Sequence, residues 1–178
     1  MKRMRRLAKF NLPNVHFVTT NVFRRHPIFT DGRYAGIIFQ ALHAYKLMHG
    51  AKVYGYVLMP DHLHLVLHLP EGREISNFMR DFKKLAARNI LVLLKTEGKV
   101  TKFARPEKGK KNYNLRFWQE GFFDFNVYSE RKFQEKLNYM HNDPVKCGFV
   151  LGPEEYPYSS YGYYAFGCKG CLEIDDMG

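Results

Sequence analysis

The chain has 178 residues, of which 46% are hydrophobic, so it is large and apolar enough to form a single domain with its own core. Lysine and arginine total 28 against 17 aspartate and glutamate, giving a formal net charge of +11. This excess favours a polyanionic partner, first of all nucleic acid, with an acidic membrane surface or an acidic protein as alternatives. The composition excludes a disordered chain, and no apolar run is as long as a membrane span.

The N-terminal segment and the cysteines bear on the compartment. Residues 1–12 are expected to form a basic arm, and because no apolar segment follows them we do not interpret them as a signal peptide. Three cysteines without such a signal fit a reducing cytoplasm. Cys168 and Cys171 have the two-residue gap of zinc sites, but Cys147 is the only other thiol. An incidental pair is therefore favoured over a structural zinc.

The first half of the chain predicts the order strand, helix, strand, strand. Alternating β-branched and aromatic residues predict a strand over 14–20, and apolar residues at helical spacing predict a helix over 33–49, with Gly50 as its stop. Two further strands are predicted over 52–58 and 62–69. Because only a short turn joins them, we expect these two strands to pair as an antiparallel hairpin.

The second strand of this hairpin carries His62 and His64, which flank one apolar residue. Side chains alternate along a strand, so both imidazoles point to the same face, about 6–7 Å apart, while Leu63 and Leu65 point into a core. Two imidazoles on one rigid surface form half of a site for a divalent metal. On spacing alone, ordinary hydrogen-bonded histidines are the more common interpretation, and a third ligand has to come from elsewhere.

A long basic helix and a basic loop follow. The helix is predicted from about Ser76 to Glu97, and residues 98–116, with two glycines and a proline, predict a mobile loop. We expect both to contact nucleic acid, although a solvated helix face and a solvated loop are the alternatives. The candidate residues are Arg80, Lys83, Lys84 and Arg88 on the helix, Lys108, Lys110 and Lys111 in the loop, and Tyr113 as a stacking residue.

The second half of the chain adds a strand over 117–128 and a helix that starts after Ser129 and ends near Asn142 or Asp143. Tyr139 and Asp143 are four positions apart and therefore share one face of this helix. A core tyrosine and a helix-ending aspartate are the ordinary interpretations of the two residues. A tyrosine-rich turn and short helix follow, and residues 167–178 predict a flexible tail, so the expected domain spans residues 13–166.

The predicted element order favours an α+β fold of the ferredoxin-like or RRM-like sandwich type, with an antiparallel sheet, helices on one face and an additional C-terminal helix. With the histidine pair and the helix tyrosine, the chain resembles the HUH-type single-tyrosine transposases, and within them the REP-associated tyrosine transposase branch. The resemblance covers most of residues 14–166. The segments that carry it, in order, are Met59-Pro-Asp-His-Leu-His64, Phe117-Trp-Gln119, Tyr139-Met-His-Asn-Asp-Pro-Val-Lys-Cys-Gly148 and Tyr156-Pro-Tyr-Ser-Ser-Tyr161.

This resemblance implies a catalytic helix with Tyr139 as nucleophile, and His62, His64 and Asp143 as ligands of Mg²⁺ or Mn²⁺. Family members often carry an amide where this chain has Asp143. The implied activity is cleavage and rejoining of single-stranded DNA at palindromic, REP-like hairpins through a 5′-phosphotyrosine. The resemblance also implies a bacterial, nucleoid-associated protein that acts as a monomer, with a dimer as the alternative.

Three other interpretations fit parts of the sequence. A non-catalytic single-stranded nucleic-acid-binding module of RRM-like fold explains the charge and the aromatic content, but it leaves the four residues His62, His64, Tyr139 and Asp143 unexplained. A metal-dependent nuclease that activates water would keep the fold without using the tyrosine. An inactive descendant would bind palindromes only.

Overall fold

The computed structural model of the protein describes residues 13–106 and 113–177. The predicted basic arm of residues 1–12 and the predicted DNA-binding residues Lys108, Lys110 and Lys111 lie outside the described residues.

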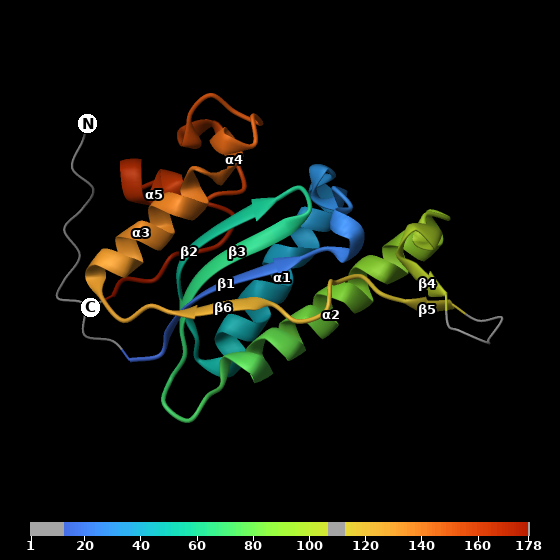
Figure 1. Cartoon of the computed structure of the whole chain (residues 1–178), viewed down its shortest axis with the longest axis horizontal. Helices are drawn as coiled ribbons and strands as arrows, with labels where there is room; N and C mark the ends of the chain where they lie inside the picture. Colours follow the sequence, from blue (N-terminus) through green and yellow to red (C-terminus); the bar gives the residue numbers. More distant parts are fainter. Residues whose placement is uncertain (1–12, 107–112, 178) are drawn as a thin grey trace.

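The centre of the fold is a four-stranded antiparallel sheet in the order β2-β3-β1-β6 (Figure 1). Helices follow the first and third of these strands in the chain, which is the ferredoxin-like arrangement, so the predicted α+β sandwich is confirmed. The expected hairpin between the second and third strands is confirmed as well. The strands are β1 (Val15–Asn21), β2 (Lys52–Met59), β3 (His62–His68) and β6 (Phe123–Asn126).

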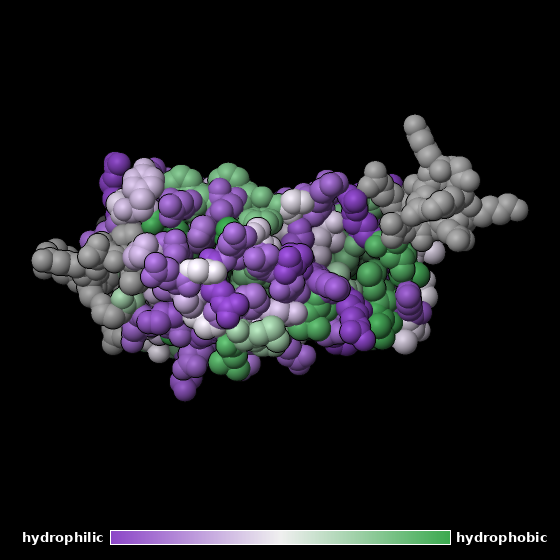
Figure 2. All heavy atoms as spheres, turned by 90° about the horizontal axis from the view of Figure 1, so that it is seen from below, coloured by the Kyte–Doolittle hydropathy of each residue, from purple (hydrophilic) through white to green (hydrophobic). Residues whose placement is uncertain are grey.

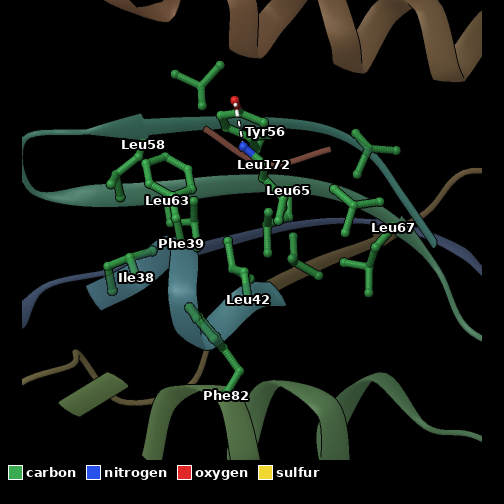
Figure 3. Close-up of a cluster of buried hydrophobic side chains, with 14 of the residues drawn as sticks. Ile38, Phe39, Leu42, Tyr56, Leu58, Leu63, Leu65, Leu67, Phe82 and Leu172 are labelled. Atoms are coloured by element: carbon green, nitrogen blue, oxygen red, sulfur yellow. Dashed lines mark hydrogen bonds between the residues drawn. The ribbon is translucent and has the colours of Figure 1, made fainter. Parts of the chain in front are cut away.

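Two long helices, α1 (Gly32–His49) and α2 (Ile75–Thr96), cover one face of the sheet. The side chain of Asp31 caps α1 by accepting a hydrogen bond from the backbone N–H of Arg33, and Gly50 ends the helix in the left-handed conformation. No described helix is long and apolar enough to cross a membrane. Figure 3 shows the side chains that meet in the core: Leu63, Leu65 and Leu67 from β3, Ile38, Phe39 and Leu42 from α1, and Phe82 from α2.

A third helix, α3 (Glu130–His141), packs on the opposite face over β2 and β3 (Figure 1). It begins where predicted, because the Ser129 hydroxyl caps it at 3.3 Å from the backbone nitrogen of Lys132. The helix lies close to the sheet because β2 has a glycine beneath it. A Cβ atom on Gly55 would lie 2.7 Å from Cδ2 of Leu137, which is closer than such atoms pack.

The region after α2 differs from the expected long mobile loop. It contains a short helical turn over Val100–Phe103 and a small hairpin of β4 (Ala104–Pro106) and β5 (Tyr113–Leu115). The strand expected over 117–128 is reduced to β6. Before β6, the Trp118 indole is buried and donates a hydrogen bond to the Lys83 carbonyl at 3.0 Å, so this part of the chain serves packing against α2.

The expectation of a flexible C-terminal tail is wrong for residues 167–177. After α5 (Tyr161–Phe166), the chain runs back along the edge of β2. The backbone N–H of Asp175 donates to the Val53 carbonyl at 2.9 Å, and its carboxylate accepts from the Val53 N–H at 2.7 Å and pairs with Lys46 at 2.7 Å. Leu172 and Ile174 are buried beside these bonds. The segment therefore covers an otherwise open sheet edge.

Candidate metal and nucleophile site

Three possible metal-ligand atoms converge on the face of the sheet that carries α3. His62 Nε2 lies 3.1 Å from His64 Nε2 and 3.1 Å from Asp143 Oδ2, and His64 Nε2 lies 3.4 Å from the same carboxylate oxygen. Both histidines are buried, and Asp143 is partly buried. The expected common face of the two histidines is thus present, and Asp143 joins them. Among the described residues, this is the only cluster of three or more histidine, cysteine or acidic side chains with the spacing of a metal site.

Asp143 reaches the histidines because the chain turns at the end of α3. That helix ends at His141, and a short helix, α4 (Asp143–Lys146), begins immediately. Pro144 occupies the first turn of α4, where a missing N–H costs nothing, and its ring is buried. The buried proline therefore anchors the turn that directs the Asp143 carboxylate toward β3.

Asp61 and Thr19 orient the two imidazoles by contacting their Nδ1 atoms, on the side of each ring away from the cluster. His62 Nδ1 lies 2.6 Å from Oδ1 of Asp61, and His64 Nδ1 lies 2.7 Å from Oγ1 of Thr19, its partner across the β1–β3 ladder. Arg25 holds the other oxygen of Asp61 at 2.8 Å. In the tautomers that place hydrogen on both Nδ1 atoms, Asp61 and Thr19 accept hydrogen bonds and the Nε2 atoms are left as ligands.

The electrostatics of the cluster follow from burial and hydrogen bonding. When the Nε2 atoms also carry hydrogen, in the imidazolium forms, they donate to Asp143, and these hydrogen bonds from His62 and His64 hold the pKa of the Asp143 carboxyl far below its usual range. Burial lowers the pKa of His64. Burial also opposes the charged form of His62, but its hydrogen bonds to Asp143 and Asp61 outweigh that effect and raise the pKa of His62. The site thus presents an ionised carboxylate beside two imidazoles, a donor set suited to a divalent cation.

Tyr139 lies beside this cluster, near the end of α3. Its ring centroid is 5.8 Å from that of His64 and 6.0 Å from that of Phe17. The side chain remains 46% exposed, so it is not a core tyrosine. Lys146 of α4 places its Nζ 5.0 Å from the centroid of the same ring. At one open edge of the site, the Tyr139 side chain with its hydroxyl therefore meets the three converging ligand atoms and the ammonium group of Lys146.

The predicted DNA-binding residues of α2 occupy different environments. Lys84 and Arg88 are exposed, and Arg80 is exposed but pairs with Asp81 at 2.8 Å. Lys83 is less exposed than these three residues, and its ammonium donates to the carbonyls of Gln119 and Gly121 at 3.1 and 2.5 Å. Burial lowers the pKa of Lys83 to about 8. It therefore tethers the segment before β6 instead of standing free on the surface.

An open groove of about 470 Å³ lies between α2 and the segment before β6. Seen from below Figure 1, on the side of α2, the surface is mostly hydrophilic with smaller hydrophobic areas (Figure 2). Tyr113 lies in β5, and its side chain is not among the described ones. The groove combines cations with aromatic rings; its lining includes Arg80, Lys83, Lys84, Arg116, Trp118 and Phe122.

Sequence reasoning missed several residues of the site. Thr19 gave no signal, because only the register between β1 and β3 brings it to His64. Asp61 directly precedes His62, in the short turn between β2 and β3, and the local pattern does not distinguish it from an ordinary turn residue. Lys146 lies within the Tyr139–Gly148 segment without any assigned role. The three cysteines are exposed, and none of them belongs to the metal-type cluster.

The chain is similar to several known proteins. The family model described as "Transposase IS200 like" matches residues 9–143. A Haemophilus influenzae (strain Rd) protein, provisionally named a REP-associated tyrosine transposase, is 29% identical over 108 residues, 58% of this chain and 55% of that protein. The REP-associated tyrosine transposase of Escherichia coli K12 is 23% identical over 111 residues, 62% of this chain and 54% of that protein. The matched segments thus span about half the length of each curated relative.

A solved structure, of a REP-associated tyrosine transposase bound to a REP hairpin, has the same fold with a TM-score of 0.67. That likeness covers all of this chain and 93% of the other, at 20% sequence identity. The resemblance of the sequence to REP-associated tyrosine transposases is therefore matched by both named relatives and by the fold. Because the family model covers most of its length, the chain belongs to the IS200-like transposase family.

Proposed function

We propose that this protein cleaves and rejoins single-stranded DNA at hairpin-forming, REP-like sequences, with Tyr139 as nucleophile and a divalent metal held by His62, His64 and Asp143. One observation carries the proposal. The half-exposed ring of Tyr139 lies 5.8 Å from the ring of His64, at the open edge of three converging ligand atoms. An RRM-like binding module has no need of this arrangement.

The donor set fits Mg²⁺ or Mn²⁺, with Mn²⁺ accepting both imidazole and carboxylate readily. His62 Nε2, His64 Nε2 and Asp143 Oδ2 would hold the ion, while Asp61 and Thr19 fix the imidazole orientations. When bound, such an ion polarises a non-bridging oxygen of the phosphate and neutralises its charge. The carboxylate of Asp143 provides the negative charge that favours a cation over a water molecule here.

The proposed step uses the residues of this chain as follows. The Tyr139 hydroxyl attacks phosphorus and loses its proton to water, the bond from phosphorus to the 3′-oxygen breaks, and the leaving strand takes up a proton as a free 3′-OH. The 5′-phosphate remains on Tyr139 as a phosphodiester. Attack by a 3′-OH on this phosphotyrosine reverses the step and rejoins DNA without an external energy source. The ammonium of Lys146, beside the Tyr139 ring, is positioned to attract the phosphate.

Two observations support hairpin DNA as the partner. The net charge of the chain is +11, and the solved structure of similar fold, described above, is of a transposase bound to a REP hairpin. A monomer is supported by the site itself. His62, His64, Asp143 and Tyr139 meet within one chain, so no second subunit is needed to complete the site.

The direct test is covalent capture. Labelled hairpin oligonucleotides with single-stranded flanks, drawn from repeats near the gene, are incubated with the protein and Mn²⁺ or Mg²⁺ and run on a denaturing gel. We expect a protein–DNA adduct that requires the metal, disappears with EDTA and is absent from Tyr139→Phe, which keeps the ring but lacks the hydroxyl. Tyr128→Phe is a matched control, because Tyr128 is also exposed but does not contact the histidines.

Two outcomes would overturn the proposal. Binding of the hairpins without adduct or cleavage, across several sequences, would favour the non-catalytic binding module. Cleavage that survives in Tyr139→Phe would mean that water or another residue is the nucleophile.

A further inference from the structure

Helix α3 leaves part of the sheet face uncovered next to the proposed nucleophile. It packs over β2 and β3, whereas among the described residues no helix lies over β1 and the outer strand β6 on the same face, which α3 reaches through side chains such as Lys136 (Figure 1). The register shows which side chains point to this side: Thr19 is opposite both His64 and Phe123, and Phe17 is opposite Phe125. Phe17, Phe123 and Phe125 therefore share the face of the metal-type cluster, and we call them the aromatic shelf.

The rings of the shelf form a continuous path outward from the site. The Phe17 ring stacks on His64 with centroids 5.5 Å apart, meets Tyr139 edge-on at 6.0 Å and meets Phe123 edge-on at 6.2 Å. Phe17 is buried, but Phe123 is 54% exposed. A half-exposed phenyl ring on an outer strand contributes little to the core, and through Phe17 the Phe123 ring extends the aromatic surface that begins at Tyr139.

Lysine side chains accompany the shelf. Lys136 Nζ lies 4.4 Å from the Phe125 ring centroid and 5.2 Å from that of Phe17, and Lys146 Nζ lies over the Tyr139 ring. Over the two described ranges, neither ammonium forms an ion pair with a carboxylate; Lys132, by contrast, pairs with Glu135 at 2.8 Å. Aromatic faces beside unpaired ammonium groups are the combination that binds single-stranded nucleic acid, by stacking bases and attracting phosphates.

We propose that the aromatic shelf is a binding site for unpaired nucleotides next to the cleavage position, with a base stacked on Phe123 and the backbone phosphates held by Lys136 and Lys146. The inference rests on the proposed function, because it states how the strand reaches Tyr139. The occupant is an unpaired strand and not a duplex, since paired bases cover each other's faces. An acidic protein would use the lysines but has no nucleobase to place on the exposed ring.

The test measures binding without chemistry. The full chain carrying Tyr139→Phe is titrated in EDTA against a fluorescein-labelled oligothymidylate strand and against a labelled duplex of equal length, with anisotropy as the readout. We expect Phe123→Ala to weaken binding of the single strand by at least about fivefold and to leave duplex binding unchanged. Phe123→Tyr should restore binding of the single strand. Lys136→Met should reduce the slope of log affinity against log salt by about 0.7.

Controls separate stacking from a general loss of structure. Phe166, on α5, is 63% exposed and lies outside the shelf, so Phe166→Ala should bind the single strand like the parent. The emission of a tryptophan introduced by Phe123→Trp should be quenched by oligothymidylate, whereas that of Phe166→Trp should not. Single-strand binding by Phe123→Ala within twofold of the parent, or unquenched Phe123→Trp emission, overturns the inference. The Tyr139→Phe protein used in this binding measurement cannot form a covalent adduct. A negative result for the aromatic shelf is therefore distinguishable from a negative result of the covalent-capture experiment.

Discussion

Asp143 Oδ2 lies 3.1 Å from His62 Nε2, although 81 positions separate the two residues in the chain. The contact joins the C-terminal end of α3 to the central strand β3. It exists only when α3 is docked on the sheet, because Asp143 belongs to the turn that follows that helix. Docking of one helix therefore completes the proposed ligand set and brings Tyr139 to it at the same time.

The first prediction concerns this third ligand. Asp143→Ala should weaken Mn²⁺ binding by more than about tenfold, because loss of a ligand costs at least as much as loss of a residue that only hydrogen-bonds to a ligand. Asp143→Asn should bind more weakly than the parent but better than Asp143→Ala, since the amide oxygen can still coordinate the ion. Isothermal titration with Mn²⁺ measures all three. Glu120→Ala is the control, because the Glu120 side chain is exposed and takes no part in the cluster. Unchanged affinity in Asp143→Ala would exclude Asp143 from the ligand set.

The second prediction uses two neighbouring threonines that face opposite sides of β1. Thr19→Val removes the hydroxyl at 2.7 Å from His64 Nδ1 and should weaken Mn²⁺ binding by about 10–100-fold without unfolding the protein. The hydroxyl of Thr20 is buried and has no hydrogen-bond partner among the residues that the structure describes. Thr20→Val should therefore leave metal binding unchanged and stabilise the fold by up to about 1–3 kcal/mol. Equal metal affinities in the two variants would contradict the role assigned to Thr19.

The contrast between the two histidines and Thr19 shows how far the sequence could predict this site. Strand periodicity is a local property, so alternation correctly placed His62 and His64 on one face, and the Ser129 cap marked the start of α3. The position of Thr19 opposite His64 depends on strand register, which no local pattern encodes.

Two features of the structure that the sequence did not indicate have the same non-local origin. The contacts of Lys83 gave no signal because the carbonyls that it binds, at Gln119 and Gly121, come more than thirty positions later in the chain. The C-terminal tail was expected to be flexible because Leu172 and Ile174 are too few to show a periodicity. Only the edge of β2 gives those two side chains a place to be buried.

A third prediction concerns acid stability. Glu97, just after α2, accepts hydrogen bonds from Lys99 at 2.9 Å, from the Tyr34 hydroxyl at 2.7 Å and from Arg33 at 2.5 Å. These hydrogen bonds, that from Lys99 first, lower the pKa of Glu97 to about 2 from its ordinary value of 4.5. A lowered carboxyl pKa gives stability that is present above pH 4.5 and is lost as the pH falls toward 2.

Glu97→Gln should accordingly be less stable than the parent at pH 7, and the difference should shrink progressively below pH 4.5. Urea denaturation at several pH values, monitored by circular dichroism, gives the free energy of unfolding of each protein. Glu154→Gln, at an exposed position, should follow the parent at every pH. A stability difference that is the same at pH 7 and pH 3 would show that the lost contact is steric and not electrostatic.

The last prediction compares two glycines, Gly36 in α1 and Gly55 in β2, whose surroundings leave different amounts of room for an added methyl group. Gly36 is in α1 with nothing within 4 Å of an added Cβ, so Gly36→Ala should stabilise the protein by about 0.5–1 kcal/mol through helix propensity. At Gly55 the new methyl group would clash with Leu137 and Met140, so Gly55→Ala should cost about 1–3 kcal/mol by displacing α3. Displacing α3 also moves Tyr139 and Asp143 away from the histidines. We therefore expect Gly55→Ala to lose Mn²⁺ affinity and covalent capture at temperatures where it is still folded, whereas Gly36→Ala keeps both. Full capture by a folded Gly55→Ala protein would mean that the site tolerates movement of α3, and that the close packing at Gly55 serves stability alone.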